Sequence, residues 1–198
     1  MESINNIDIN DIMEDIINEK FEELNSIEEQ NDRFVKIKTF EGNAIGQIGE
    51  NFVKKVFASY QIPMEDLGKN VVHDEYDLIS NNKKIEIKTA RKGIKKDTFQ
   101  FNGINPIYNH DYIFLIGLTT NHLYYKILNG RSIYDHTRRK HYLMVNGKKR
   151  QLVSMNPGNS VNYKLTLSLS DLNDISCFVN ELRELFVNNW LWCISSQI

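Results

Sequence analysis

Apolar residues recur at spacings of three and four near both ends of the chain, which is the period of an amphipathic helix. These stripes predict helices over residues 8–30, 44–60 and 171–192, with Ser170 as the N-cap of the last one. The first helix carries an acidic outer face. We expect its apolar stripe to pack against the core, and a dimerisation helix is the alternative.

The stretch from His73 to Arg91 follows a different pattern and reads as two strands. Asn81-Asn82 joins them, because asparagine tolerates the positive φ of a tight hairpin turn. Asp77 lies in the first strand. In the second strand isoleucines alternate with Glu86 and Lys88, so this acid and this amine share one face.

Further strands follow this hairpin. Residues 112–119 form a continuous apolar run, as in a strand that is covered on both faces. Residues 122–128 and 161–169 also read as strands, and Asn146-Gly147 predicts a second hairpin. The cations and amides of residues 91–110 are typical of a loop.

The order of helices, strands and a final helix predicts an α/β (α+β) domain with a central mixed β-sheet flanked by helices. A chain of 198 residues can bury a sizeable core, and we expect one domain over residues 1–198. It divides into an acidic N-terminal helix within 1–33, a core over 44–119, and a basic segment with a C-terminal helix over 120–198.

Composition narrows the class of protein. No apolar run reaches the roughly 18 residues needed to cross a membrane, and the acidic N-terminus does not resemble a signal peptide. Cys177 and Cys193 form no metal-binding motif, so zinc is not expected. We therefore expect a cytoplasmic protein with reduced thiols and no membrane partner.

Charge is unevenly distributed along the chain, although its net value is only −2. Residues 1–33 hold eleven acids against Lys20 and Arg33, whereas residues 131–150 hold seven cations against Asp135 alone. A domain with one basic face can bind nucleic-acid phosphates at a net charge near zero. Charge alone therefore does not exclude DNA as a partner.

The hairpin carries the residues with the clearest chemistry. Asp77 and Glu86 are hard oxygen ligands, of the kind that hold Mg²⁺ when a phosphate completes its coordination. Lys88 beside them can stabilise charge on that phosphate or orient the attacking water. Glu50, on the preceding helix, can reach the same metal or a second one. A solvated pair of charges on a strand is the alternative reading of Glu86 and Lys88.

Asp77, followed nine residues later by Glu86-Ile87-Lys88, with Glu50 upstream, resembles the PD-(D/E)xK nuclease superfamily. The resemblance covers residues 46–119. It implies a restriction-endonuclease-like core and Mg²⁺-dependent hydrolysis of DNA phosphodiesters, with Mn²⁺ as a substitute. Asp77, Glu86, the backbone carbonyl of Ile87 and Glu50 would be the metal ligands, and Lys88 would serve the water. Tyr76 stands where the family motif has proline.

Recognition of DNA is expected to come from the segments after Lys88. Asparagine and glutamine pair bidentately with adenine, and cations contact phosphates or guanine. The candidate amides are Gln100, Asn102 and Asn105, and the candidate cations are Arg138, Arg139, Lys140, Lys148, Lys149 and Arg150. The alternatives are a loop capped by its own amides and a solvated run of charge.

Three functions remain open. A type II restriction endonuclease that cuts double-stranded DNA as a homodimer is favoured, because a palindromic site matches two-fold symmetry. A structure-specific nuclease, such as a Holliday-junction resolvase or a repair nickase, would use the same chemistry. A non-catalytic DNA-binding module is less favoured, because the acids and the lysine are all present.

Overall fold

The computed structural model describes residues 8–23, 33–65, 76–93, 96–156, 158 and 161–188. Its helices are α1 (Ile9–Glu23), α2 (Gly42–Ser59) and α3 (Phe178–Arg183), the last continued by a π-helical turn, η4 (Glu184–Asn188). Short 3-10 turns are η1 (Val35–Thr39), η2 (Leu169–Asp171) and η3 (Ile175–Cys177). The strands are β1 (Leu78–Ser80), β2 (Lys83–Arg91), β3 (Thr98–Ile104), β4 (Tyr112–Leu118), β5 (Leu123–Asn129), β6 (Ile133–Asp135), β7 (Lys140–Val145), β8 (Lys148–Gln151), β9 (Val153–Ser154), β10 (Tyr163–Ser168) and β11 (Asn173–Asp174).

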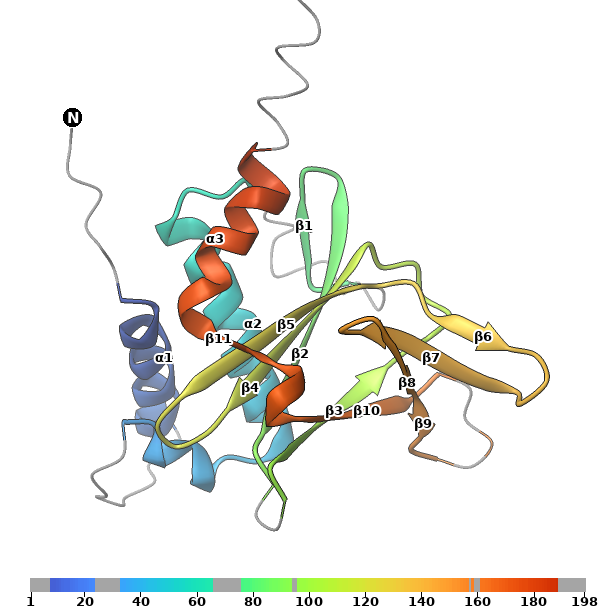
Figure 1. Cartoon of the computed structure of the whole chain (residues 1–198). Coiled ribbons are helices and arrows are strands. Elements are labelled where there is room, and N and C mark those ends of the chain that lie inside the picture. The colour runs from blue at the N-terminus through green and yellow to red at the C-terminus, as the bar shows by residue number, and fades with distance from the viewer. Residues whose placement is uncertain are drawn as a thin grey trace, which may run out of the picture.

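A mixed sheet in the order β1-β2-β4-β5-β11 forms the centre of the molecule (Figure 1). β2 and β4 run parallel, and the other neighbours are antiparallel. Two small antiparallel sheets, β3-β10-β9 and β6-β7-β8, accompany it. This mixed α/β architecture confirms the predicted fold class.

The central sheet is covered on both faces. Phe114 and Ile116 of β4 point into a core shared with α1, α2 and α3, whereas Ile113 and Leu115 point into a second core shared with the two small sheets. The alternation of side chains along a strand sends them to opposite faces. Burial on both sides explains why the β4 sequence is apolar throughout.

Helix α1 packs against the core, as its amphipathic pattern predicts. Its apolar stripe, including Met13 and Ile17, is buried. That burial removes the stripe as a free surface for a partner, so the alternative of a dimerisation helix is wrong for this face. The described part of the helix ends at Glu23, and residues 24–32, which include the predicted end of the helix, lie outside the described residues.

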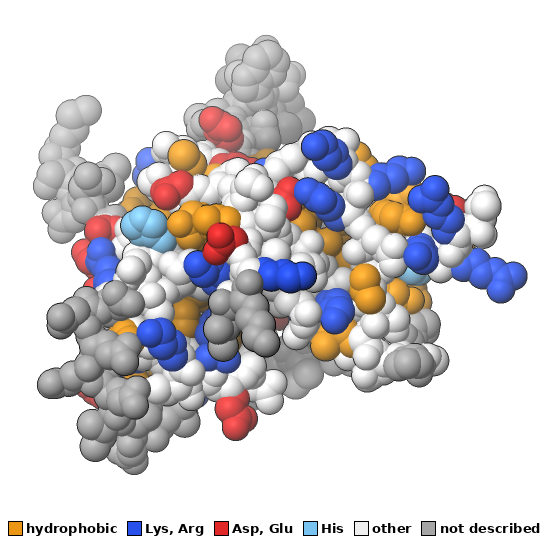
Figure 2. All heavy atoms as spheres, turned by 60° about the horizontal axis from the view of Figure 1, so that its bottom comes forward, with side chains coloured by type: hydrophobic (Ala, Val, Ile, Leu, Met, Phe, Trp, Pro, Cys, Tyr) orange, Lys and Arg blue, Asp and Glu red, His pale blue; other side chains and the backbone are white. Residues whose placement is uncertain are grey.

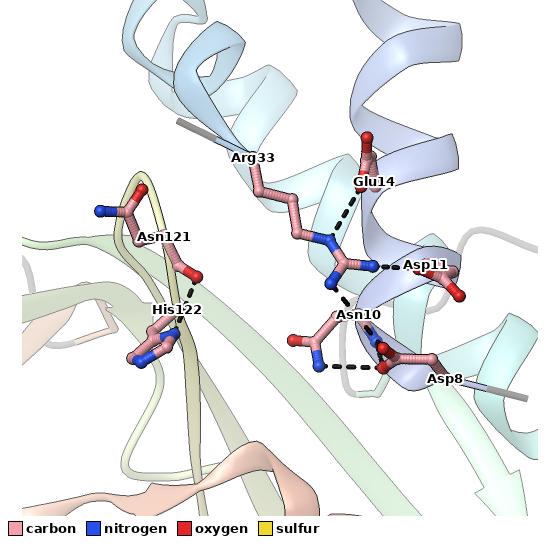
Figure 3. A network of polar contacts seen from close by, with 7 residues as sticks. All are labelled: Asp8, Asn10, Asp11, Glu14, Arg33, Asn121 and His122. Carbon is pink, nitrogen blue, oxygen red and sulfur yellow. Dashed lines mark hydrogen bonds and ion pairs between the residues drawn. The ribbon is translucent and has the colours of Figure 1, made fainter. Parts of the chain in front are cut away.

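The acidic face of α1 is held by one arginine (Figure 3). The Arg33 guanidinium pairs with Asp11, donates to Glu14 at 2.8 Å and lies 3.7 Å from Asp8. These pairs are exposed, and exposed ion pairs contribute little stability each. They fasten the chain after α1 back onto it.

The segment 91–110, predicted as a loop, contains strand β3. Phe99 and Phe101 are buried while Gln100 and Asn102 are exposed, which is the period-two pattern of a half-buried strand. The prediction of a loop was wrong because it relied on the many cations and amides of this segment. The strand pattern is carried by only two alternating aromatic residues, Phe99 and Phe101. β3 pairs with β10, far along the sequence.

The last helix also begins later than predicted. Ser168 and Asp171 form a reciprocal capping box around η2, so Ser168 takes the capping position expected of Ser170. Asp174 then accepts the Ser176 N–H and caps a second short turn. Helix α3 starts only at Phe178, and residues 189–192 of the predicted helix lie outside the described residues.

Other predicted elements are confirmed. Asn81 and Asn82 turn the β1–β2 hairpin with φ of 48° and 60°, and Asn146-Gly147 turns β7 into β8. Helix α2 spans nearly the predicted residues. Within the described residues, no helix is long and apolar enough to cross a membrane.

Candidate active site

The candidate site forms where β1 separates from β2. β1 pairs only with residues 83–85 of β2, so among the described residues no strand pairs with this edge of β2 from Glu86 onward. Residues 87–91 of that edge line a cleft of about 700 Å³. An open strand edge exposes backbone donors and acceptors to whatever occupies the cleft.

Asp77 lies at the point of separation, one residue before β1. Its N–H donates to the Ile85 carbonyl at 3.0 Å, and its Oδ2 accepts the N–H of Ile87 at 2.7 Å. The carboxylate therefore replaces the next hydrogen bond of the β1–β2 ladder. This brings it beside the Glu86-Ile87-Lys88 segment, as the hairpin predicted, while Asp74 and Glu75 lie outside the described residues.

Glu86 is the most buried acid of the site, with 8% of its surface exposed. Burial raises the pKa of Glu86 to about 7, and repulsion from Asp77 adds to this shift, while the ammonium of Lys88 opposes it. Lys88 forms an ion pair with Glu86. The predicted acid and amine therefore form an ion pair that is largely buried. This burial does not fit the alternative of a solvated pair of charges on the surface.

Glu50 reaches this pair because α2 packs closely on β2. A Cβ at Gly49 would lie 1.7 Å from Thr89 Oγ1, so only glycine permits this approach. Burial raises the pKa of the neighbouring Glu50, and repulsion from Asp77 raises it further. Gly49 is a site residue that sequence reasoning missed, since a helical glycine alone carries no signal of a close contact.

The walls of the cleft come from α2 and β3. Glu50 and Lys88 lie with Gln100 and Asn102 in its lining, and the Gln100 amide donates to Asn102 Oδ1 at 3.0 Å. The structure thus brings two of the three predicted amides into the same cleft as Glu50 and Lys88. The lining residues that were not predicted include Asn43, Gln47, Met155 and Asn162.

Asn105 lies elsewhere. It is 8% exposed, and its Oδ1 accepts the N–H of Ile107 at 3.0 Å. An amide that closes its own turn matches the alternative of a capped loop. We therefore leave Asn105 out of the cleft residues that we consider for DNA contact.

The predicted cations lie on the β6-β7-β8 sheet. Figure 2 shows Lys and Arg side chains gathered at this end of the molecule. Arg138 and Arg139 lie in the β6–β7 turn, Lys140 begins β7, and Lys148 and Lys149 begin β8. All five are exposed.

Arg150 differs from these five cations. It pairs with the buried carboxylate of Asp171 at 2.5 Å, a contact that joins β8 to η2. We assign Arg150 a structural role because removing it would leave that carboxylate without its cation.

The donor set of the site fits a divalent cation. Within the described ranges, no three acid, histidine or cysteine side chains are already gathered tightly enough to hold a metal. Yet Asp77 and Glu50 both repel the buried Glu86, and all three offer oxygen donors. A hard cation such as Mg²⁺ relieves this repulsion and prefers such donors.

No protein family, curated protein or solved structure matched this chain when it was compared with each of these groups. No function can therefore be inferred from a relative, and the geometry and chemistry of the site are the basis for the proposed function. The resemblance to the PD-(D/E)xK superfamily stays a prediction. It rests on Asp77, Glu86 and Lys88 and on their spacing.

Proposed function

We propose that this protein is a Mg²⁺-dependent endonuclease that hydrolyses phosphodiester bonds in double-stranded DNA, as a member of the PD-(D/E)xK superfamily. One observation carries the proposal. The buried Glu86 carboxylate pairs with Lys88, next to the strand residue Ile87 that Asp77 holds, and Lys88 and Glu50 line the open cleft beside it. Perturbed acids that face a cleft are typical of catalytic sites.

The chain's own residues have separate tasks in this reaction. Asp77 and Glu86, with the Ile87 carbonyl, would hold the cation, and Glu50 would complete or extend the set. When bound, Mg²⁺ supplies Lewis-acid polarisation of the phosphoryl group and lowers the pKa of water. The Asp77 carboxylate is held in place by its hydrogen bond from Ile87 N–H.

Lys88 acts on the phosphate and on the attacking water. Its side chain is 21% exposed and lines the cleft together with Gly103 of β3. An ammonium in a partly desolvated site stabilises developing negative charge strongly. Its ion pair with Glu86 keeps it in position until a phosphate enters.

Double-stranded DNA is supported as the substrate by two surfaces. The Gln100–Asn102 pair presents amides in the catalytic cleft, and amides read adenine edges. The exposed cations of the β6-β7-β8 sheet suit phosphate contacts. We propose sequence-specific type II restriction by a homodimer, which sedimentation of the protein with and without DNA would test.

The decisive experiment is incubation of the purified protein with unmodified plasmid DNA and Mg²⁺. We expect discrete fragments from the wild-type protein and none in EDTA. Cleavage of four-way junctions alone would instead indicate a structure-specific nuclease. If neither substrate is cut, the nuclease proposal fails.

The matched control is a pair of single substitutions. Glu86→Gln keeps the shape of the side chain and removes its charge, whereas Glu22→Gln changes an exposed acid of α1. We expect Glu86→Gln to abolish cleavage and Glu22→Gln to leave it intact. Equal cleavage by both variants would show a contaminating nuclease.

A further inference from the structure

A second cavity lies apart from the proposed catalytic cleft. It has a volume of about 1110 Å³ and opens at the carboxyl ends of the parallel strands β2 and β4. In Figure 1 the segments that line it, η1, the β4–β5 turn and the end of β2, lie together at the bottom of the molecule. In open α/β sheets this end of the strands is where ligands bind.

The lining of this cavity, which we call the basic pocket, combines two kinds of surface. Lys38, Arg91 and Lys92 line it. No acid is among its described lining residues, although Lys92 pairs with the exposed Asp97 at 3.0 Å, which a bound phosphate would displace. Leu118 and the ring of Tyr124 add apolar surface. Cations next to an aromatic ring suit a ligand that is anionic at one end and flat at the other.

Arg91 is fixed in place by the backbone. Its Nη1 donates to the carbonyls of Ile37 at 2.9 Å and Lys38 at 3.0 Å, so η1 is tied to the end of β2. A guanidinium has five N–H donors, so this leaves three for other partners. The planar group also matches the geometry of a phosphate.

Arg91 also connects the basic pocket with the catalytic cleft, since it lines both. It follows Lys88 by three residues of extended strand, a span of roughly 10 Å. A DNA strand whose reacting phosphate lies at Lys88 would therefore bring the next nucleotides to the basic pocket. This placement rests on the proposed nuclease function, whereas the lining of the pocket does not.

We propose that the basic pocket binds a single nucleoside phosphate, with the phosphate at Lys38, Arg91 and Lys92 and the base against Tyr124. When DNA is bound, the basic pocket holds a nucleotide next to the phosphate that reacts. His122 lies in edge contact with Tyr124, at 6.2 Å between ring centroids, and extends the aromatic side. Stacking on such a ring tolerates every base.

The test is a titration of the metal-free, full-length protein with each of the four deoxynucleoside 5′-monophosphates, followed by backbone amide shifts. We expect shifts at Lys92, Gly93 and His122. Lys38→Glu should weaken binding at least tenfold, and the control Lys55→Glu, at an exposed lysine of α2 that lines neither the basic pocket nor the cleft, should not. Tyr124→Leu should weaken nucleotide binding while leaving inorganic phosphate unaffected.

Four results would overturn the proposal: no shift at these amides at millimolar nucleotide, equal weakening by both lysine variants, inorganic phosphate binding as tightly as the nucleotides, or decanoate binding more tightly than any nucleotide. The last would mark a site for acyl anions. Because no DNA is cut in this titration, its failure leaves the nuclease proposal standing. Failure of plasmid cleavage likewise leaves the pocket standing.

Discussion

The two walls of the candidate cleft differ in how the polar residues on and beside them are held. On the α2 and β2 wall, Glu50 lines the cleft and is half-buried, Glu86 is buried next to it, and the pKa of each is raised. On the β3 wall, Gln100 and Asn102 are exposed and neutral. Substitution of a buried ionisable residue is expected to change both the reaction rate and the stability of the fold, whereas substitution of an exposed amide is expected to change only DNA binding. Substitutions on the two walls should therefore have different signatures.

The largest effect is expected on the α2 and β2 wall. Glu86→Gln should lower the rate of plasmid cleavage by at least about three orders of magnitude, because it removes a proposed metal ligand and the partner of Lys88. Single-turnover cleavage at saturating protein measures this. Loss of less than tenfold would remove Glu86 from the proposed chemistry.

The same substitution should have the opposite effect on the stability of the metal-free protein. The pKa of Glu86 is raised to about 7 in the folded protein, mainly by burial. Folding therefore favours the protonated acid, and wild-type stability should fall as pH rises from about 4.5 to about 7. Glu86→Gln should remove that fall and be more stable at pH 8 by roughly 1–3 kcal/mol.

Urea unfolding in EDTA at pH 5 and pH 8 measures this difference. Glu22→Gln is the control, and its stability should follow that of the wild type at both pH values. A wild-type protein that is equally stable at the two pH values would contradict the account of Glu86.

The packing of α2 on β2 gives the next effect. Gly49→Ala places a Cβ against Thr89 Oγ1, so α2 must move away and carry Glu50 with it. We expect a loss of about 1–3 kcal/mol in the free energy of unfolding and at least a tenfold loss of cleavage. Gly46→Ala, on the same helix with open space around its Cβ, should be neutral or slightly stabilising.

Thermal denaturation distinguishes these two glycine variants. Because Gly46 lines the cleft, Gly46→Ala serves as a control for the stability measurement and not for the cleavage assay. Equal melting temperatures for the two variants would show that the close approach at Gly49 is dispensable.

On the β3 wall the effect should be smaller and of a different kind. Gln100→Ala and Asn102→Ala should each weaken binding at the preferred site by about 10–100-fold, if each amide reads one base. The melting temperature and non-specific binding should stay unchanged, because both side chains are exposed. Fragment patterns and competition binding measure this, and a uniform loss on all sequences would exclude base reading.

The smallest effect belongs to the basic sheet. Lys148→Ala with Lys149→Ala removes two exposed charges, which should reduce the salt dependence of DNA binding by about two units of its logarithmic slope. Lys55→Ala, on α2 beside Glu19, is the control. An unchanged slope in the double variant would remove this sheet from the DNA interface.

The sequence predicted the parts of the fold that local pattern dictates. The asparagine turn of the β1–β2 hairpin, helix α2 and the buried strand β4 each carry their own signal over a few residues. Asp77, Glu86 and Lys88 came together because two strands and one tight turn fix their register.

The parts that escaped prediction depend on distant contacts. β3 is held by β10, and α3 is delayed by two short capped turns, so neither could be recognised from local composition. The fit of Gly49 on Thr89 and the basic pocket come from residues far apart in the sequence. Such contacts leave no periodic pattern for a single sequence to reveal.

The most direct test of the central claim is calorimetric titration of Mg²⁺ into the wild-type protein, Glu86→Gln and Glu22→Gln at pH 8. We expect binding to the wild type and to Glu22→Gln, with at least tenfold weaker binding to Glu86→Gln. Binding of equal strength to all three proteins would show that the acids of the cleft do not hold the cation, and would contradict the account.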